Sequence, residues 1–167
     1  ELVAVCDVRK DFALERVGSA CPVYTNIDEM LKNEEIDVVD ICTPSYLHAE
    51  MAVECLNKGL NVLCEKPMTL TCRDAEKVLA AAENRGKKFM VAHVVRFMPQ
   101  YAFLKKVTDE GKLGKLISLD MRRLSSVPRW SWENWMQDEQ KSGGVCLDLS
   151  VHDIDFVQSV LGMPERV

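Results

Sequence analysis

The chain has 167 residues, of which 47% are hydrophobic and 28% are charged, and its formal net charge is −5. These proportions are typical of a globular protein and exclude a disordered or fibrous chain. The acidic balance offers no basic surface, so we expect no nucleic-acid partner, and no apolar run reaches the roughly 20 residues of a membrane span. The seven cysteines include no C-x-x-C pair, which predicts neither a metal site nor a disulfide framework and favours a cytoplasmic location.

Short apolar runs alternate with helix-like segments through the first part of the chain. The expected strands, in chain order, are Leu2–Asp7, Val23–Tyr24, Val38–Cys42, Asn61–Cys64 and Phe89–His93. Several of these runs are apolar almost without alternation, as in strands that helices cover on both faces. Thr25 with Asp28, and Thr71 with Asp74, have the spacing of a capping box and predict helix starts. The pattern therefore predicts βαβ units around a parallel sheet, an α/β fold.

The pattern changes after residue 95. A helix is expected over Pro99–Glu110, a longer strand over Lys115–Leu124, and a last helix over Leu147–Leu161. The partial alternation of the expected strand is typical of a strand with one exposed face. We therefore predict most of one α/β domain over residues 1–95 and the beginning of a second domain over residues 96–167.

Asp7 ends the first expected strand and precedes a helical segment. In a doubly wound nucleotide-binding sheet, with strand order 3-2-1-4-5-6, an acidic residue at the end of strand 2 holds the ribose hydroxyls. If Asp7 is that residue, we expect strand 1 and its G-x-G-x-x-G loop to precede Glu1, and the chain contains no such motif. An aspartate at a strand end could also only cap the next helix. Because strand 1 is central, we expect the isolated chain to be unstable or to recruit another strand.

The same aspartate bears on the choice of dinucleotide. A carboxylate at Asp7 would accept hydrogen bonds from the ribose 2′-hydroxyl and repel a 2′-phosphate, which favours NAD over NADP. Arg9 keeps NADP open, because its guanidinium could reach such a phosphate. We therefore predict NAD as the cofactor, with NADP as the alternative.

Two turns follow apolar strands at what should be the carboxyl edge of the sheet. The run Ile41–His48 leaves a strand through Thr43-Pro44, and the run Val62–Pro67 delivers Glu65-Lys66-Pro67. Ligands bind at this edge in open α/β folds. Proline excludes α geometry at Lys66, so its ammonium should extend into the crevice and could donate to a substrate oxygen. A plain turn and a surface lysine at a strand end would explain the same residues.

A third segment runs from Gly143-Gly144 to Asp155. The two glycines would let the backbone approach another group closely. Asp148 and His152 are four residues apart, on one face of the expected helix. A carboxylate and an imidazole placed in this way suit proton transfer near neutral pH. Half of a zinc site or a structural salt bridge would have the same spacing.

Taken in order, these segments resemble the Gfo/Idh/MocA family of oxidoreductases. The resemblance spans essentially the whole chain and rests on five motifs: Asp7 at a strand end, Thr43-Pro44 with His48, Glu65-Lys66-Pro67, the run His93–Tyr101, and Gly143-Gly144 with Asp148 and His152. It implies an NAD(P)-binding Rossmann domain followed by an α/β domain with an open, mostly antiparallel sheet that usually mediates oligomerisation. By this resemblance the chain would be truncated at both ends.

The resemblance also implies a reaction and a role for each motif. Family members transfer a hydride between NAD(P) and a carbon that bears a hydroxyl, often on a sugar, inositol or related polyol. His152 would be the general base, Lys66 would stabilise negative charge on the oxygen, and Asp148 would either bind substrate or fix the other two. The expected cofactor contacts are Asp7, Arg9, Thr43, Pro44, His48, Glu65 and Lys66.

Two further residues are candidates for substrate binding. Trp135, and less clearly Trp132, could stack on a sugar face, and Arg96 could line the crevice; burial in the core and a surface ion pair are the alternatives. Related architectures also include non-catalytic dinucleotide-binding regulators, NAD-assisted glycoside hydrolases, and reductases of dihydrodiols or carbonyls. The combination of Lys66, Asp148 and His152 favours a polyol dehydrogenase, which we expect to be a homo-oligomer at full length.

Overall fold

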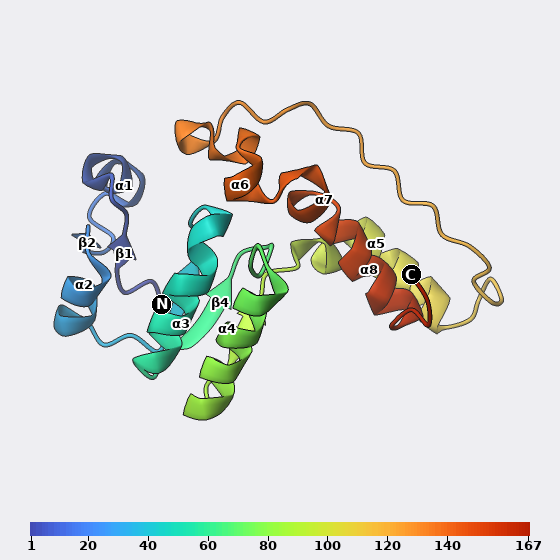
Figure 1. Cartoon of the computed structure of the whole chain (residues 1–167), viewed down its shortest axis with the longest axis horizontal. Helices are drawn as coiled ribbons and strands as arrows, with labels where there is room; N and C mark the ends of the chain where they lie inside the picture. Colours follow the sequence, from blue (N-terminus) through green and yellow to red (C-terminus); the bar gives the residue numbers. More distant parts are fainter. The chain divides into compact units, whose positions relative to one another are not determined.

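A computed structural model describes residues 1–167, and the chain forms two compact units, Glu1–Val39 and Asp40–Val167 (Figure 1). The predicted domain division at residue 95 falls within the second unit and stays a prediction.

The first unit contains two short parallel strands and two helices. Its elements are β1 (Val5–Cys6), α1 (Lys10–Val17), β2 (Val23–Tyr24) and α2 (Ile27–Asn33). Val5 pairs with Val23, and the amide of Asp7 donates to the carbonyl of Tyr24 at 3.0 Å. β1 is shorter than the expected strand Leu2–Asp7, because its partner strand has only two residues. Asp7 therefore directly follows β1, as predicted.

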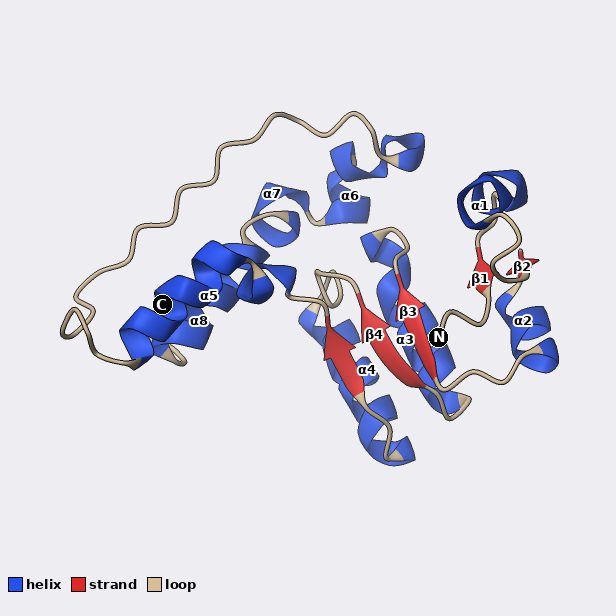
Figure 2. Ribbon diagram, turned by 180° about the vertical axis from the view of Figure 1, so that it is seen from behind, coloured by secondary structure: helices blue, strands red, loops and turns tan.

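The second unit is built on a three-stranded parallel sheet in the order β3-β4-β5, although the first two residues of β3 fall before the unit boundary at Asp40. Its elements are β3 (Val38–Ile41), the 3-10 turn η1 (Ser45–Leu47), α3 (His48–Asn57), β4 (Asn61–Cys64), α4 (Cys72–Arg85) and β5 (Phe89–Val91). Helices α3 and α4 lie side by side over one face of the sheet (Figure 2). Buried side chains fill this interface, including Ile41, Leu56, Val62 and Val78. Burial of each such side chain stabilises the folded state by about 1.5–3 kcal/mol.

The strands form two separate sheets, β1-β2 and β3-β4-β5. The α/β class with parallel strands is confirmed.

One of the two predicted helix caps forms. Thr71 caps α4: its hydroxyl accepts from the Asp74 amide at 3.1 Å and donates to the Asp74 carboxylate at 2.7 Å. The prediction at Thr25 is wrong by one residue, because the Asn26 side chain accepts the amide of Glu29 instead. Asparagine is at least as good a helix cap as threonine. The helix therefore begins after Asn26, whose side-chain oxygen accepts the free backbone amide.

The regular elements in the rest of the second unit are all helices. It contains η2 (Val94–Phe97), α5 (Pro99–Asp109), η3 (Trp132–Gln137), α6 (Glu139–Ser142), α7 (Gly144–Asp148) and α8 (Val151–Leu161). Helix α5 packs on α8 through an edge-to-face contact of Tyr101 with Phe156, with ring centroids 4.9 Å apart. Apolar side chains are also exposed on this helix pair, among them Phe103 and Ile154.

The prediction of a strand over Lys115–Leu124 is wrong. These residues form an extended connection without strand pairing, and Ile117 and Leu124 are 88% and 97% exposed. A strand is stabilised by hydrogen bonds to a neighbouring strand, and no segment of this chain pairs with Lys115–Leu124. The mostly antiparallel sheet expected for the second domain is therefore not formed within residues 96–167.

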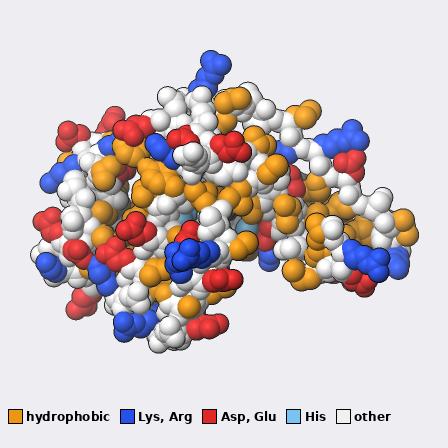
Figure 3. Space-filling view, viewed as in Figure 1, with side chains coloured by type: hydrophobic (Ala, Val, Ile, Leu, Met, Phe, Trp, Pro, Cys, Tyr) orange, Lys and Arg blue, Asp and Glu red, His pale blue; other side chains and the backbone are white.

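The surface carries charges of both signs. Acidic and basic side chains are intermixed on the face shown in Figure 3, and no large basic field is visible there. None of the helices is both long and apolar enough to cross a membrane. No group of three or more metal-ligating side chains is found in the chain.

Candidate active site

The candidate site lies at the carboxyl edge of the sheet β3-β4-β5. Because parallel strands end at the same edge, the turn at Thr43-Pro44 follows β3, the run Glu65-Lys66-Pro67 follows β4, and His93 follows β5. The segment from α7 to α8 adds Asp148 and His152 to this edge. The sequence predicted that the turns after β3 and β4 meet at this edge, but not that His93 joins them.

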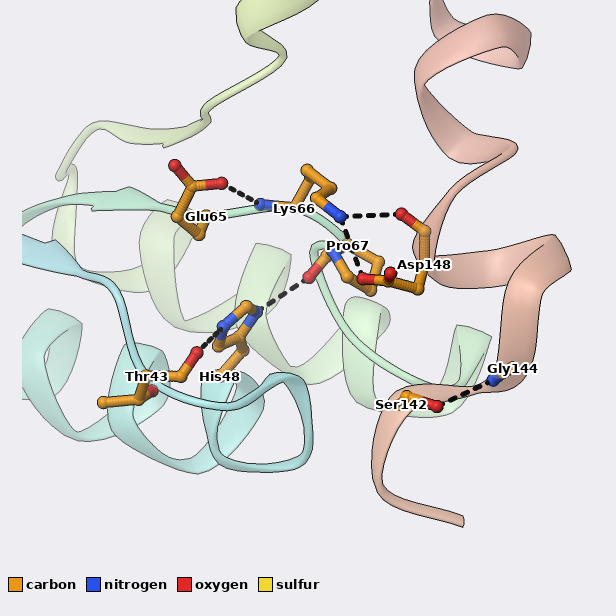
Figure 4. A network of polar contacts seen from close by, with 8 residues as sticks. All are labelled: Thr43, His48, Glu65, Lys66, Pro67, Ser142, Gly144 and Asp148. Carbon is orange, nitrogen blue, oxygen red and sulfur yellow. Dashed lines mark hydrogen bonds and ion pairs between the residues drawn. The ribbon is translucent and has the colours of Figure 1, made fainter. Parts of the chain in front are cut away.

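Lys66 binds Asp148 through two oxygen atoms. Its Nζ lies 2.8 Å from Oδ1 of Asp148 and 2.7 Å from the carbonyl oxygen of the same residue (Figure 4). The two side chains are only 16% and 19% exposed, so this is a largely desolvated ion pair and not a surface lysine. Of the two roles expected for Asp148, the contact supports the one in which it fixes Lys66.

The Asp148 carbonyl is available because the expected helix Leu147–Leu161 is broken. In a continuous helix the amide of His152 would donate to this carbonyl. Instead it donates to Leu149 at 3.4 Å, and the amide of Ser150 reaches Val145 at 3.2 Å. Asp148 therefore ends α7 while His152 lies in α8, so the prediction that both lie on one face of the same helix is wrong.

Gly143 and Gly144 set the direction of α7. Both have positive φ, at 76° and 72°, which few side chains tolerate. A Cβ at Gly143 would lie 2.4 Å from the Leu147 side chain, so this position requires glycine. The Ser142 hydroxyl accepts the amide of Gly144 at 3.1 Å (Figure 4). The same hydroxyl donates to the Asp138 carbonyl. The close approach predicted for the two glycines is therefore made by Gly143 to Leu147 of α7 and by Gly144 to Glu139 of α6.

The backbone around Lys66 is fixed on its N-terminal side. The amide of Glu65 donates to the carbonyl of Ile41 on β3 at 2.9 Å, and the amide of Lys66 donates to the Glu65 carboxylate at 3.1 Å. The Lys66–Pro67 peptide bond is cis. The Glu65 carboxylate therefore helps to hold the backbone of the turn that contains Lys66.

His152 has a partly buried imidazole, and its Nδ1 is buried without a hydrogen-bond partner. Burial is the main cause that lowers the pKa of His152 from its ordinary value of 6.5. The nearby cations Lys66 and Arg123 lower the pKa further, and so does His93. The Asp148 carboxylate acts in the opposite direction. The imidazole is therefore neutral at pH 7 and can accept a proton.

Asp155, an acidic residue of α8, binds the neighbouring side chains of the site. The Asp155 side chain is 8% exposed, and it accepts two hydrogen bonds from Arg96, from Nε at 2.7 Å and from the terminal nitrogen at 2.5 Å. His93 lies beside this pair, with Nε2 at 3.6 Å from Oδ1 of Asp155. Burial lowers the pKa of His93, while Asp155 opposes that effect. Arg96 thus forms an ion pair, although its side chain is 46% exposed.

His48 is almost completely buried and contacts two backbone carbonyls. Its Nε2 lies 2.8 Å from the oxygen of Thr43, and its Nδ1 lies 2.8 Å from the oxygen of Pro67. Both ring nitrogens therefore face the protein, and the ring has no further polar atom with which to bind a cofactor. The Thr43 hydroxyl donates to the sulfur of Met51 at 3.5 Å.

The remaining predicted site residues lie elsewhere in the chain. Trp135 is half-buried within η3, and Trp132 is 38% exposed. In the first unit Asp7 accepts hydrogen bonds from the Arg9 backbone and guanidinium, between 2.8 and 3.2 Å. Burial raises the pKa of Asp7, but the hydrogen bonds from Arg9 outweigh it and the pKa is lowered.

Three residues at the site were missing from the sequence-based set: His93, Arg123 and Asp155. Arg123 binds Asp153 at 2.7 Å and lies near the Tyr101 hydroxyl, at 3.4 Å. A signal for Asp155 existed, because it is a carboxylate three residues after His152 in the same helix. Arg123 gave no such signal, since its contacts span 22 and 30 residues.

Comparison with known proteins assigns both parts of the chain. A family model described as an oxidoreductase family with an NAD-binding Rossmann fold matches residues 1–93. A second model, described as a GFO/IDH/MocA C-terminal domain, matches residues 101–167. Both matches agree with the resemblance drawn from the motifs.

Individual relatives share about a third of the sequence. The 2,7-anhydro-N-acetylneuraminate hydratase of Mediterraneibacter gnavus is 32% identical over 148 residues, covering 88% of this chain and 39% of the relative. The D-glucoside 3-dehydrogenase of Escherichia coli is 32% identical over 167 residues, covering 98% and 47%. The crystal structure of a putative myo-inositol dehydrogenase from Sinorhizobium meliloti has a TM-score of 0.82 and 30% identity, covering 98% and 48%. The chain therefore spans less than half the length of these relatives.

Proposed function

Because the chain belongs to the Gfo/Idh/MocA family of NAD-binding oxidoreductases, we propose that the full-length protein is an NAD-dependent dehydrogenase. Its substrate is a sugar, inositol or related polyol, oxidised at a CH–OH group. One observation carries this proposal. Two oxygens of Asp148 hold the Lys66 ammonium, and the nearby imidazole of His152 has a lowered pKa.

The residues of this chain fit part of a dinucleotide site. Asp7 directly follows β1 and has a lowered pKa, so its carboxylate is ionised and can accept from ribose hydroxyls. Because the Arg9 guanidinium already pairs with this carboxylate, we propose NAD in preference to NADP. Thr43, Pro44 and Glu65 would line the cofactor at the carboxyl edge of the second sheet. NAD, when bound, accepts the hydride from the carbon that bears the hydroxyl.

The protein's own residues manage the proton and the charge. His152 takes the hydroxyl proton, because a neutral imidazole with a lowered pKa is unprotonated at pH 7. Lys66 donates a hydrogen bond to the same oxygen and stabilises the negative charge that develops there. Asp148 holds the ammonium in place, so little reorganisation is needed when the charge forms.

Two other residues would contact the substrate. Arg96 is bound to Asp155 but remains 46% exposed, so part of its guanidinium can still donate to a hydroxyl. Trp135 offers an aromatic face against which a sugar ring could stack. The division of domains at residue 95, the cytoplasmic location and the homo-oligomeric state stay predictions.

A second candidate reaction is the hydration or cleavage of an anhydro sugar or glycoside with no net redox change. It is favoured by the relative named as a 2,7-anhydro-N-acetylneuraminate hydratase, which is 32% identical. The same residues would serve, with His152 moving the proton and Lys66 stabilising the oxygen. A regulator without catalysis is disfavoured, because it would not need the Lys66–Asp148 pair.

A substrate screen tests the proposal. Full-length protein is incubated with NAD and a panel of sugars, inositols and anhydro sugars, and the absorbance of reduced nicotinamide is followed beside product analysis. The dehydrogenase predicts reduced cofactor in proportion to ketone product. Product without net reduction would support the second candidate, and neither product nor reduction across the panel would contradict both.

A further inference from the structure

His48 occupies an unusual place among the residues of the site, because it is 1% exposed and yet polar. It is the first residue of α3, and its ring lies between two turns that follow different strands (Figure 4). One contact is with the carbonyl of Thr43, after β3, and the other is with the carbonyl of Pro67, after β4. Both nitrogen–oxygen distances are 2.8 Å, which is within the range of good hydrogen bonds.

The chemistry of these partners constrains the ring. A carbonyl oxygen accepts a hydrogen bond but cannot donate one, so each nitrogen must carry a proton if both contacts are hydrogen bonds. A neutral imidazole has only one N–H, whereas the imidazolium form has two. Burial disfavours the charged ring, so two protonated nitrogens require that the two charge-assisted hydrogen bonds to the carbonyls outweigh the cost of burying the charge.

The contact with Pro67 matters because Pro67 directly follows Lys66. On its other side Lys66 is held through Glu65, whose amide donates to Ile41 and whose carboxylate accepts the Lys66 amide. His48 completes this arrangement from the C-terminal side. The backbone of Lys66 is thus held on both sides while its ammonium is bound by Asp148.

We propose that His48 is a positioning residue for Lys66, which donates from both ring nitrogens at once and ties the Thr43 turn to the Lys66–Pro67 turn. It acts through the backbone and touches neither substrate nor cofactor. This assignment replaces the cofactor contact that the sequence motif implied for His48. Its effect on catalysis rests on the proposed function, whereas its hydrogen bonding does not.

The first test measures the ring directly. Full-length protein labelled with 15N-histidine is examined by NMR at neutral pH, where an unrestrained histidine is mostly neutral. The signals of His48 are assigned by their loss in His48→Phe, or, if that variant does not fold, in His48→Gln. Two protonated ring nitrogens are expected. One protonated and one bare nitrogen would overturn the proposal, whether or not the protein is a dehydrogenase.

The second test measures positioning. His48→Phe keeps a planar ring but removes both donors, so we expect kcat to fall by about 100-fold, as for a displacement of about 1 Å. The Kd for NAD should rise as well, because the released Thr43 turn lines the cofactor in the proposed site. Leu56→Ala, fully buried near the other end of α3, is the matched control for lost stability. It should lower Tm without lowering kcat. An unchanged kcat in a folded His48→Phe protein would overturn the proposal.

Discussion

The Lys66 ammonium contacts the backbone carbonyl and the carboxylate of Asp148, at 2.7 and 2.8 Å. The carbonyl contact depends on the break between α7 and α8, because a continuous helix would use that oxygen internally. Sequence spacing alone would pair Asp148 with His152, as neighbours on one helix. The structure pairs it with a lysine 82 residues away, and this pairing determines how the site handles charge.

The first prediction concerns the coupling of this pair. Asp148→Asn removes the charge but leaves the carbonyl contact, so we expect hydride transfer in full-length protein to slow by about 10- to 100-fold. Because Asp148 acts on the reaction through Lys66, the Lys66→Met/Asp148→Asn double variant should be no slower than Lys66→Met alone. Single-turnover rates of the four proteins test this. Multiplication of the two single effects would contradict it.

The second prediction concerns the protonation of His152. Its pKa is lowered by burial first and by Lys66 next, while Asp148 raises it. Lys66→Met removes a lowering influence, so the pKa should rise; Asp148→Asn removes a raising influence, so the pKa should fall. NMR titration of His152 in full-length protein measures both, with His152→Asn for assignment. Shifts in the same direction would be inconsistent with this electrostatic account.

The protonation of His152 should also determine how activity falls at low pH. A general base is active only when unprotonated, so alcohol oxidation should be lost as pH falls through the His152 pKa, which lies below 6.5. The wild-type profile of kcat/KM against pH measures this limb. A limb above 6.5 would show that another group, or a raised His152 pKa, controls the reaction.

A third prediction compares two arginine–aspartate pairs. Arg96→Met leaves the 8%-exposed carboxylate of Asp155 without its main partner, so the free energy of unfolding should fall by about 2–3 kcal/mol. Arg122→Met is the control, because Arg122 and Asp120 are 82% and 67% exposed and such pairs contribute less than about 1 kcal/mol. Denaturant unfolding of the full-length variants measures both. Equal losses would mean that Asp155 is not buried in solution.

The fourth prediction concerns the dinucleotide. Asp7→Ser removes the carboxylate that would repel a 2′-phosphate and releases the Arg9 guanidinium from its bonds to Asp7. The ratio of kcat/KM for NADP to that for NAD should therefore rise by at least about tenfold, equivalent to one hydrogen bond to a charged group. Asp11→Ser, in the first turn of α1, is the matched control and should leave the ratio unchanged. An unchanged ratio in Asp7→Ser would place the ribose elsewhere.

Local patterns in the sequence were sufficient to predict the strand ends. The apolar runs before Asp7, Thr43 and Lys66 end where parallel strands end, and the common edge of β3 and β4 brings two of these turns together. This succeeded because strand periodicity and turn residues are local properties. The cap at Thr71 was predicted for the same reason, whereas the competing Asn26 displaced the cap expected at Thr25.

The parts that the sequence did not predict depend on distant contacts. The alternation in Lys115–Leu124 is that of a strand, but strand formation needs a partner that local pattern cannot supply. The break at Leu149 and Ser150 has no glycine or proline to announce it, and it matters because Lys66 takes the carbonyl of Asp148. The bridge made by His48 joins Pro67 across 19 residues and was equally invisible.

The central claim is that Lys66, held by Asp148, carries the charge that develops in hydride transfer. The most direct measurement is the single-turnover rate of cofactor reduction by full-length Lys66→Met, compared with wild type at saturating NAD and the best substrate from the screen. Loss of one preorganised donor to the developing charge predicts a rate lower by about 100- to 1,000-fold, with folding intact by circular dichroism. A folded Lys66→Met protein that reduces the cofactor at the wild-type rate would contradict the account.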